Sequence, residues 1–420
     1  MYLILLKVNL MSDKANNKKK FTGYQKFIIA VLTLTQFSVV LDFMVMSPLG
    51  DILMKSMSLS TTEFGIAVFA YAFSAGISGI LTAGFADSFD RKKLLLFFYI
   101  GFVLGTLFCG LANTYPLLIM ARIFTGVFGG VIGSISMAIV SDLFELNQRG
   151  RVMGFLQMGF GSSQVLGVPI SLFLANKWGW QSPFFMIVIL AFIIWILIFF
   201  KMKPINAHLE NKIEHNPFKH LVTTLSNPSY RVGFMATALM SLGGFMMMPW
   251  GSSHAINNLK VTEEQLPFLF MLAGISTLII MPIIGSLSDK IDKFKLFTIT
   301  SVWLMAMVLI YTNLVQVPFW MVVILNIFMM IGVISRMVPS IAMVTALPKV
   351  HDRGAFMSIN SSLQQMSGGV AAAIGGMIVV QKDNYSPLEN YDVLGVVVVF
   401  IIISCIINLR RVDKIIKLNK

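Results

Sequence analysis

The sequence predicts an all-α integral membrane protein, with twelve transmembrane helices arranged in two pseudo-symmetric six-helix halves. Hydrophobic residues make up 56% of its 420 residues, charged residues 12%, and the mean hydropathy is +0.81. That leaves too little charged surface to coat a soluble globule. In addition, one short polar turn occurs twice, about 200 residues apart, and each copy lies between two long apolar segments. This is the pattern expected of a duplicated membrane bundle.

The apolar segments define the individual helices. A helix that crosses a bilayer needs about 20 apolar residues. Twelve stretches meet this length, six in each half: 25–48, 64–86, 94–112, 116–140, 152–175, 183–200, 231–251, 265–287, 296–313, 318–342, 355–380 and 393–409. The predicted organisation is a tail (1–24), a first half (25–200), a linker (201–230), a second half (231–409) and a second tail (410–420).

The repeated polar turn carries an acidic residue at the end of one span and basic residues at the start of the next. Its copies cover residues 83–93 and 285–295. Asp87 corresponds to Asp289 and Arg91 to Lys293, at a constant register of 202 residues. An aspartate in this place can face the positive end of a neighbouring helix. The four residues are therefore predicted to form a latch that holds one of two conformations. The simpler alternative is that they only end and orient their helices.

The distribution of Lys and Arg predicts the orientation. Basic residues gather in the N-terminal tail, the linker, the C-terminal tail and the loops after even-numbered spans, while the opposite loops hold only Lys55, Lys177, Lys260 and Lys382. The positive-inside rule then predicts that both termini are cytoplasmic. The expected location is the inner (cytoplasmic) cell membrane. The formal charge of +13 reflects topology and anionic lipid. It does not indicate nucleic acid as a partner, because no single basic patch exists.

Several features argue against other classes. The apolar residues 1–10 lack the pattern of a signal peptide, and Met11 is an alternative start. Cys109 and Cys405 lie in separate spans, so neither a disulfide framework nor a metal site is expected. His208, His215 and His220 fall in the linker at spacings that do not share a helical face. No cofactor is predicted, and the absence of an intramembrane cluster of His, Asp and Glu argues against an enzyme.

Asp42 is the acidic residue that most needs an explanation, because it lies well inside the first apolar run. A charged carboxylate there is costly, so it must be protonated, paired or facing an aqueous cavity. Each of these suits a proton carrier, although a neutral Asp bound to a neighbouring helix remains the alternative. Arg122 and Arg336 are the basic residues deep in spans. Arg122 is the predicted partner of Asp42, since a buried guanidinium needs a counter-charge.

Candidate residues for a substrate cavity come from flexible apolar and polar side chains within the spans. Met and Phe suit varied hydrophobic compounds, and Gln and Asn can provide polar contacts. Polar glue between helices is the alternative for the amides. The candidates are Phe43, Met46, Gln157, Gln164, Met247, Trp250, Asn360 and Gln364.

The two turns resemble the signature Gly-x-Leu-Ala-Asp-Arg-x-Gly-Arg-Lys of the major facilitator superfamily, with Ala83 in place of the first glycine, and Asp90 and Asp292 in place of the second. The segment Arg122 to Gly126 is similar to the fourth-span Arg-x-x-x-Gly motif of that family. Val165-Leu-Gly-Val-Pro169 is similar to the fifth-span motif of proton-coupled exporters, but lacks its contiguous Gly-Pro. This form resembles the branch that includes sugar and nucleoside exporters.

The resemblance implies a monomeric secondary transporter that works by alternating access. The expected function is export of a small amphipathic molecule in exchange for protons, with Asp42 and Arg122 as the proton-coupling residues. One alternative is proton-coupled uptake or efflux of a sugar, nucleoside or other metabolite. Another is a membrane sensor that transports nothing. Neither the substrate nor the direction of transport follows from the sequence.

Overall fold

A computed structural model describes residues 21–83, 86–206, 209, 217–349, 352–383 and 385–418. Met11, His208 and His215 lie outside these residues. The first half contains α2 (Gly23–Val45), α3 (Gly50–Met57), α4 (Thr61–Ala83), η1 (Ala86–Ser88), α5 (Arg91–Leu111), α6 (Tyr115–Leu143), α7 (Leu146–Ser162), η2 (Ser163–Gly167), α8 (Val168–Trp178) and α9 (Ser182–Lys201). The second half contains α10 (Pro217–Ser226), α11 (Pro228–Phe245), η4 (Met248–Trp250), α12 (Gly251–Ser253), η5 (His254–Asn258), α13 (Leu266–Lys290), α14 (Lys293–Thr312), α15 (Phe319–Val344), α16 (Arg353–Ile378) and α17 (Tyr391–Leu418).

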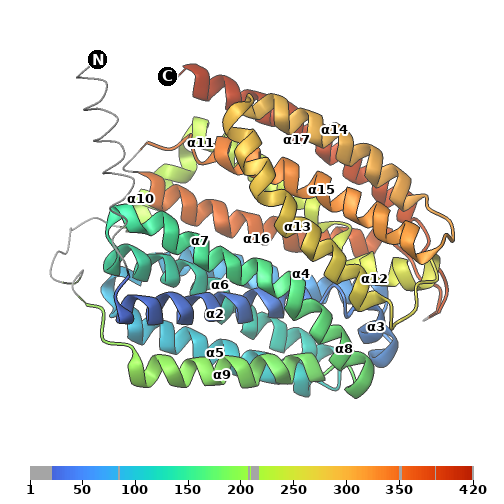
Figure 1. Ribbon diagram of the computed structural model, residues 1–420, viewed down its shortest axis with the longest axis horizontal. Helices are drawn as coiled ribbons and strands as arrows, with labels where there is room; N and C mark the ends of the chain where they lie inside the picture. Colours follow the sequence, from blue (N-terminus) through green and yellow to red (C-terminus); the bar gives the residue numbers. More distant parts are fainter. Residues whose placement is uncertain are drawn as a thin grey trace, which may run out of the picture.

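The twelve predicted spans are present as helices, which confirms the predicted fold class. Within the described residues, eleven helical segments are long and apolar enough to cross a membrane, including the composite segments Gln148–Trp178 and Pro228–Asn258. The twelfth is α16, which has 26 residues but carries Ser, Asn and Gln along its length. Its polar composition is tolerated because it packs into the centre of the bundle beside α4 (Figure 1).

Local sequence signals explain where the helices begin. Thr22 caps α2 in a capping box with Gln25, and the Asn227 side chain caps α11 by accepting the N–H of Ser229 and Tyr230. These side chains satisfy N–H groups that the first turn of a helix leaves without partners. Proline occupies one of the first two positions of α6 and α9, where no N–H is needed.

The structure differs from the predicted organisation at the connections. The linker predicted for residues 201–230 contains the helix α10, and α11 already begins at Pro228. Residues 410–418 continue α17 instead of forming a separate tail. The added helix α3 follows the first span and turns back through Ser58, which has a φ of 53°. A helix of eight residues that includes Asp51 and Lys55 is too short and too polar to be recognised as a span.

The helices form two groups side by side, with α4 of the first half against α16 of the second (Figure 1). Small residues allow this close approach. A Cβ atom on Gly65 would lie 2.8 Å from the carbonyl oxygen of Ala372, and one on Gly76 would lie 2.4 Å from Cγ of Met366. One hydrophobic cluster includes residues of both groups, and a second lies within the second half. The halves are thus separate bundles that meet along a seam of small residues.

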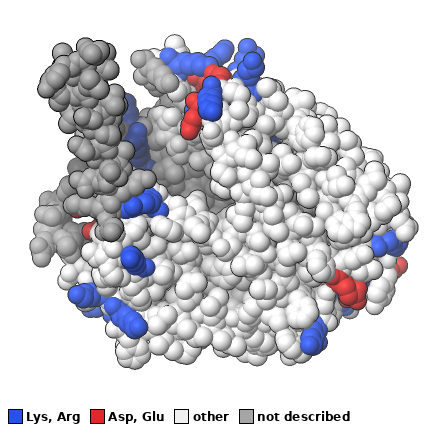
Figure 2. Space-filling model, in the orientation of Figure 1, with Lys and Arg blue, Asp and Glu red and all other residues white. Residues whose placement is uncertain are grey.

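The bundle has two distinct ends. At the terminal end, on the left of Figure 1, α2 begins, α9 ends and α10 lies; at the distal end, on the right, lie α3 and α12. Figure 2 shows Lys, Arg, Asp and Glu gathered toward the ends, with a broad uncharged band between them. Such a band is what a chain surrounded by lipid requires.

Polar contacts between the halves gather at the distal end. Thr61 Oγ1 donates to the carbonyl of Val379 at 2.7 Å, and Thr62 Oγ1 to that of Gly376 at 3.0 Å. Ser47 exchanges hydrogen bonds with η4 and α12: its hydroxyl donates to the Met248 carbonyl, and its own carbonyl accepts from Ser252. These contacts close the distal end.

Candidate functional site

The buried ion pair of the first half joins three helices. Arg122 on α6 donates from Nη1 to Oδ2 of Asp42 on α2 at 3.0 Å. Thr106 on α5 donates from Oγ1 to the other carboxylate oxygen, Oδ1, at 3.1 Å. Both side chains of the ion pair are 0% exposed. The pairing expected from the sequence is therefore present, because a charge at this depth needs a partner.

The rest of the guanidinium is held by the fourth helix of the cluster. Its carbon atom lies 4.3 Å from the ring centroid of Tyr71 on α4, which is a cation–π contact. Among the described residues, Nε and Nη2 of Arg122 have no hydrogen-bond acceptor. Each carboxylate oxygen thus accepts from one donor, while two nitrogens of the guanidinium have no acceptor among the described residues. Any movement of α2 against α6 changes the charge environment of Asp42.

The repeated turn builds the same local structure in both halves. Asp90 caps α5 by accepting the N–H of Lys93 at 3.0 Å, and Asp292 caps α14 by accepting the N–H of Lys295 at 2.9 Å. These are the aspartates that replace the second glycine of the signature. The residues after them also correspond: Arg91 donates to the carbonyl of Ala86, and Lys293 to that of Ser288.

The predicted latch residues have different surroundings in this conformation. Arg91 pairs through Nε with Asp142 of α6 at 3.1 Å, within the first half. Asp289 is exposed. Asp292 contacts Lys417 of α17 at 3.2 Å, within the second half. The side chain of Asp87 lies outside the described residues. The contacts seen at the turns therefore join helices of the same half.

The apolar cavity candidates lie where the halves meet. Met46 and Trp250 are both 0% exposed, and Met247 is 8% exposed. Trp250 packs edge-on against Phe64 of the first half, with ring centroids 5.6 Å apart. Phe43 contacts the rings of Tyr71 and Phe245 at 5.6 and 5.7 Å. Met46 and Trp250 therefore form part of the closed distal end, and do not line an open cavity in this conformation.

The polar candidates are more accessible. Gln157 on α7 and Gln364 on α16 are exposed. Asn360 is half-buried and accepts a hydrogen bond from Thr237 of α11 at 2.5 Å. Gln164 lies in the π-turn η2, whose backbone approaches α13 so closely that a Cβ on Gly274 would lie 3.2 Å from the Gln164 carbonyl oxygen. The structure does not bring these four side chains into one contact cluster.

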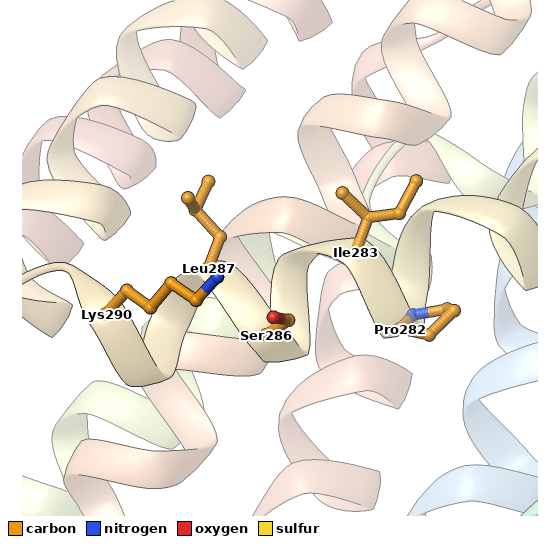
Figure 3. Close-up of a pocket in the computed structure, with 5 residues that line it drawn as sticks. All are labelled: Pro282, Ile283, Ser286, Leu287 and Lys290. Carbon is orange, nitrogen blue, oxygen red and sulfur yellow. The ribbon is translucent and has the colours of Figure 1, made fainter.

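Two surface hollows lie toward the terminal end. One, of about 500 Å³, is lined by Pro282, Ile283, Ser286, Leu287 and Lys290, all from α13 (Figure 3). The second, of about 430 Å³, is lined by Ala342, Thr345, Ala346, Pro348, Arg353 and Met357. Neither hollow contains a predicted cavity residue. Both are open depressions at the surface, away from the buried Asp42–Arg122 pair.

Sequence reasoning missed a polar contact at the distal end. Asp51 on α3 is 1% exposed, and its Oδ1 accepts from Asn257 of η5 at 2.5 Å. Lys55 lies 2.7 Å from the other carboxylate oxygen and 5.0 Å from the ring centroid of Tyr385. This group joins the two halves. Its sequence signal was an acidic residue shortly after an apolar run, which is equally common in exposed loops.

His254 is a second group that the sequence did not single out. It is 1% exposed, and its ring is stacked on Tyr391 with centroids 4.1 Å apart. Tyr311 lies against it at 5.5 Å. His254 begins the π-turn η5, where the seventh span departs from α-helical geometry. Such turns often mark functional sites.

Two six-helix bundles with an intramembrane ion pair define a multi-pass membrane protein of the transporter type. The family model of the Major Facilitator Superfamily matches residues 32–372 and 233–414. The chain belongs to the Major Facilitator Superfamily, whose members are transporters and not enzymes.

Its relatives include named drug-resistance proteins. The chain is 22% identical over 370 residues to multidrug resistance protein 2 of Bacillus subtilis, covering 86% of this chain and 90% of that protein. It is 25% identical to the uncharacterized MFS-type transporter YceJ of Bacillus subtilis and 28% identical to multidrug resistance protein fnx1 of Schizosaccharomyces pombe. Those two matches cover 60% and 52% of this chain, but only 65% and 42% of the relatives' lengths.

Solved structures share the fold. A bacterial homolog to the human lysosomal transporter Spinster, in an inward-facing and unoccupied conformation, matches with a TM-score of 0.76 and 14% identity, covering 96% of this chain and 99% of that chain. A D-xylose-proton symporter matches with a TM-score of 0.74 and 16% identity, covering 90% and 97%. At these identities the likeness concerns the fold alone.

Proposed function

We propose that this protein exports a small amphipathic molecule in exchange for protons, by alternating access between its two halves. Asp42 carries the proton, and Arg122 modulates its proton affinity. The observation that carries this proposal is the fully buried Asp42–Arg122 ion pair. A carboxylate at this depth exists either paired or neutral, so the breaking of the pair and the uptake of a proton are linked.

Export is favoured by the relatives that are named multidrug resistance proteins. The Lys and Arg residues of the tails and linker favour an orientation with the terminal end in the cytoplasm, and we infer that the protein lies in the inner cell membrane. In that orientation the closed distal end faces outward, and the conformation is inward-facing. The partners are then the substrate, protons and the lipid bilayer, and the protein acts as a monomer.

The turns at the terminal end supply the latch of the opposite conformation. When that end closes, Asp87 faces the positive start of a helix in the other half, and Asp289 does the same from its side. Arg91 and Lys293 hold the turns in shape through the carbonyl contacts described above. Asp87→Asn should therefore speed the labelling of a cysteine placed at Thr345, which lines the hollow near this end. An unchanged rate would leave Asp87 with only a helix-ending role.

The test of proton coupling uses the purified protein in lipid vesicles. A panel of drugs, sugars and nucleosides is screened for substrate-dependent proton movement. Asp42→Asn should abolish transport driven by a proton gradient and leave substrate exchange without a gradient largely intact. Asp392→Asn is the matched control, because Asp392 is an exposed carboxylate at the start of α17. Gradient-driven transport that survives in Asp42→Asn would refute the assignment.

A further inference from the structure

Arg336 on α15 is a buried cation that the transport mechanism does not yet use. Its exposure is 2%, and arginine keeps its charge throughout the range in which proteins function. Among the described residues, neither Nε nor Nη2 has a hydrogen-bond acceptor. The guanidinium lies 5.4 Å from the ring centroid of Phe297 and close to the thiol of Cys405. A ring and a thiol offset only part of the cost of burying a charge.

Arg122, the buried arginine of the first half, has a carboxylate partner that Arg336 does not have among the described residues. Arg122 also lies over an aromatic ring, that of Tyr71 at 4.3 Å, but it has in addition the carboxylate of Asp42 at 3.0 Å. Both arginines lie on the fourth span of their half. In the second half, the polar side chain against Arg336 is the thiol of Cys405, and no carboxylate of the described residues acts on the guanidinium.

A glycine on α11 faces Arg336, although Arg336 is not the register counterpart of Arg122, which at 202 residues corresponds to Ile324. At the register of 202 residues Asp42 corresponds to Gly244, and the neighbouring Gly243 faces Arg336. A Cβ on Gly243 would lie 3.8 Å from Nη1 of Arg336, with its nearest neighbour, Cγ2 of Ile401, at 3.5 Å. These are ordinary contact distances, so a side chain at Gly243 would begin beside the guanidinium without a clash.

The helix that carries Gly243 is interrupted next to this site. α11 ends at Phe245, and the span continues through the 3-10 turn η4 and the π-turn η5. Interrupted helices commonly form the binding sites of transporters, because they can shift and can direct backbone groups at a ligand. A shift of α11 at this interruption would therefore let a ligand reach the buried side chain of Arg336.

We propose that Arg336 binds an anionic group, either the carboxylate of an organic compound or a small inorganic anion, at the guanidinium beside Gly243 of α11. The inference deepens the proposed function, on which its physiological role rests: the transported molecule, or an ion that accompanies it, is negatively charged. An anion here neutralises a cation that no acidic side chain of the described residues contacts.

The test measures the thermal unfolding midpoint of the purified protein in detergent. Sodium benzoate, sodium chloride and uncharged benzamide are added at equal concentrations. A ligand that binds only the folded state raises the midpoint, so benzoate, chloride or both should raise it while benzamide should not. A rise with benzoate alone indicates an organic carboxylate, and an equal rise with chloride indicates a small inorganic anion. No rise with either anion in the wild-type protein would overturn the proposal.

Gly243→Asp provides the decisive variant, with Gly243→Asn as the control of matched size. An internal carboxylate competes at an effective concentration of about millimolar or above, so Gly243→Asp should lose the anion response and Gly243→Asn should keep it. Equal responses in Gly243→Asp and the wild type would contradict the assignment. If Gly243→Asp does not fold, Arg336→Gln replaces it with the same expected loss. The measurement needs no proton gradient, so its outcome is separate from that of the transport test.

Discussion

Asp90 and Asp292 perform the same structural task at corresponding positions of the two halves. Each caps the next helix through a backbone N–H three residues later. Each also contacts the end of its own half: Asp90 accepts the N–H of Ile205, shortly after α9, at 3.0 Å, and Asp292 accepts from Nζ of Lys417, in the last turn of α17, at 3.2 Å. This double contact explains why aspartate replaces the glycine of the family signature in both copies.

Replacing Asp292 should therefore destabilise the second half. Loss of an N-cap side chain costs about 1 kcal/mol, and Asp292→Ala should lower the free energy of unfolding by that amount at neutral pH. The backbone N–H of Lys295 holds the pKa of Asp292 below its ordinary value. A carboxylate with a lowered folded pKa stabilises at pH values above its unfolded pKa, and this contribution is lost as the pH falls through the folded pKa.

The measurement is the unfolding midpoint of wild type and variant at pH 7 and at about pH 3, just below the ordinary carboxylate pKa of about 3.9. The difference between them should shrink at the lower pH. Asp289→Ala is the matched control, because Asp289 is an exposed carboxylate on the same turn. A pH-independent difference would mean that the charge of Asp292 contributes nothing.

Asn257 should hold the distal end closed. Asn257→Ala removes the donor to the buried Asp51 carboxylate, a loss of about 2 kcal/mol or roughly thirtyfold in the balance between conformations. A cysteine at Leu49, which is 0% exposed at this end, should then react faster with a thiol reagent. The native Cys109 and Cys405 are both buried.

The control for this experiment is Asn176→Ala. Asn176 also joins the halves at the distal end, donating to the Glu263 carbonyl at 2.8 Å, but its contact is exposed to solvent. It should change the labelling rate little. Equal acceleration by both substitutions would show that the buried carboxylate has no special part in closure.

Gly65 should be intolerant of a side chain. The added Cβ of Gly65→Ala would lie 2.8 Å from the Ala372 carbonyl oxygen, so α4 and α16 must separate. Overpacking of this kind costs about 1–3 kcal/mol, which a lower unfolding midpoint would reveal. Gly354→Ala on α16 is the control, since a Cβ there has no neighbour within 4 Å. A normal midpoint for Gly65→Ala would mean that the seam can widen freely.

Substitution of Gln364 should alter substrate selectivity, whereas substitution of Trp250 should lower the stability of the fold. Gln364 is exposed on α16, and Gln364→Ala should change which compounds are transported while leaving the pH dependence of transport in place. Trp250 is fully buried, and Trp250→Ala should lower the unfolding free energy by about 3–5 kcal/mol. Transport assays with several substrates, together with unfolding curves, distinguish the two. A shift of the pH profile in Gln364→Ala would contradict this division.

The sequence predicted the spans and the Asp42–Arg122 pair for related reasons. A long apolar run has one stable solution in lipid, a helix. A charge within such a run must find a partner, and few candidates existed. Both predictions followed because an unpaired backbone group in lipid and an unpaired buried charge each cost a large free energy.

Other features depend on information that a linear pattern does not contain. The contact of Asp51 with Asn257 joins residues 206 positions apart, and nothing local distinguishes Asp51 from an exposed loop residue. Met46 and Trp250 were expected in a cavity, but they are buried because this conformation is closed at the distal end. A chain that alternates between two conformations has two burial patterns, and its sequence does not say which one a structure will capture.

Because the hydrogen bonds between the halves lie at one end of α4, a small rotation at that end produces a large displacement at the other. The hydrogen bonds of Thr61 and Thr62 with α16 lie at one extremity of α4, so they act as a fulcrum. At a rise of 1.5 Å per residue, the 23 residues of α4 form a lever of about 35 Å. A tilt of about 10° at the fulcrum then moves the opposite extremity by roughly 6 Å. A few short hydrogen bonds can thus govern a displacement wide enough to pass a small molecule.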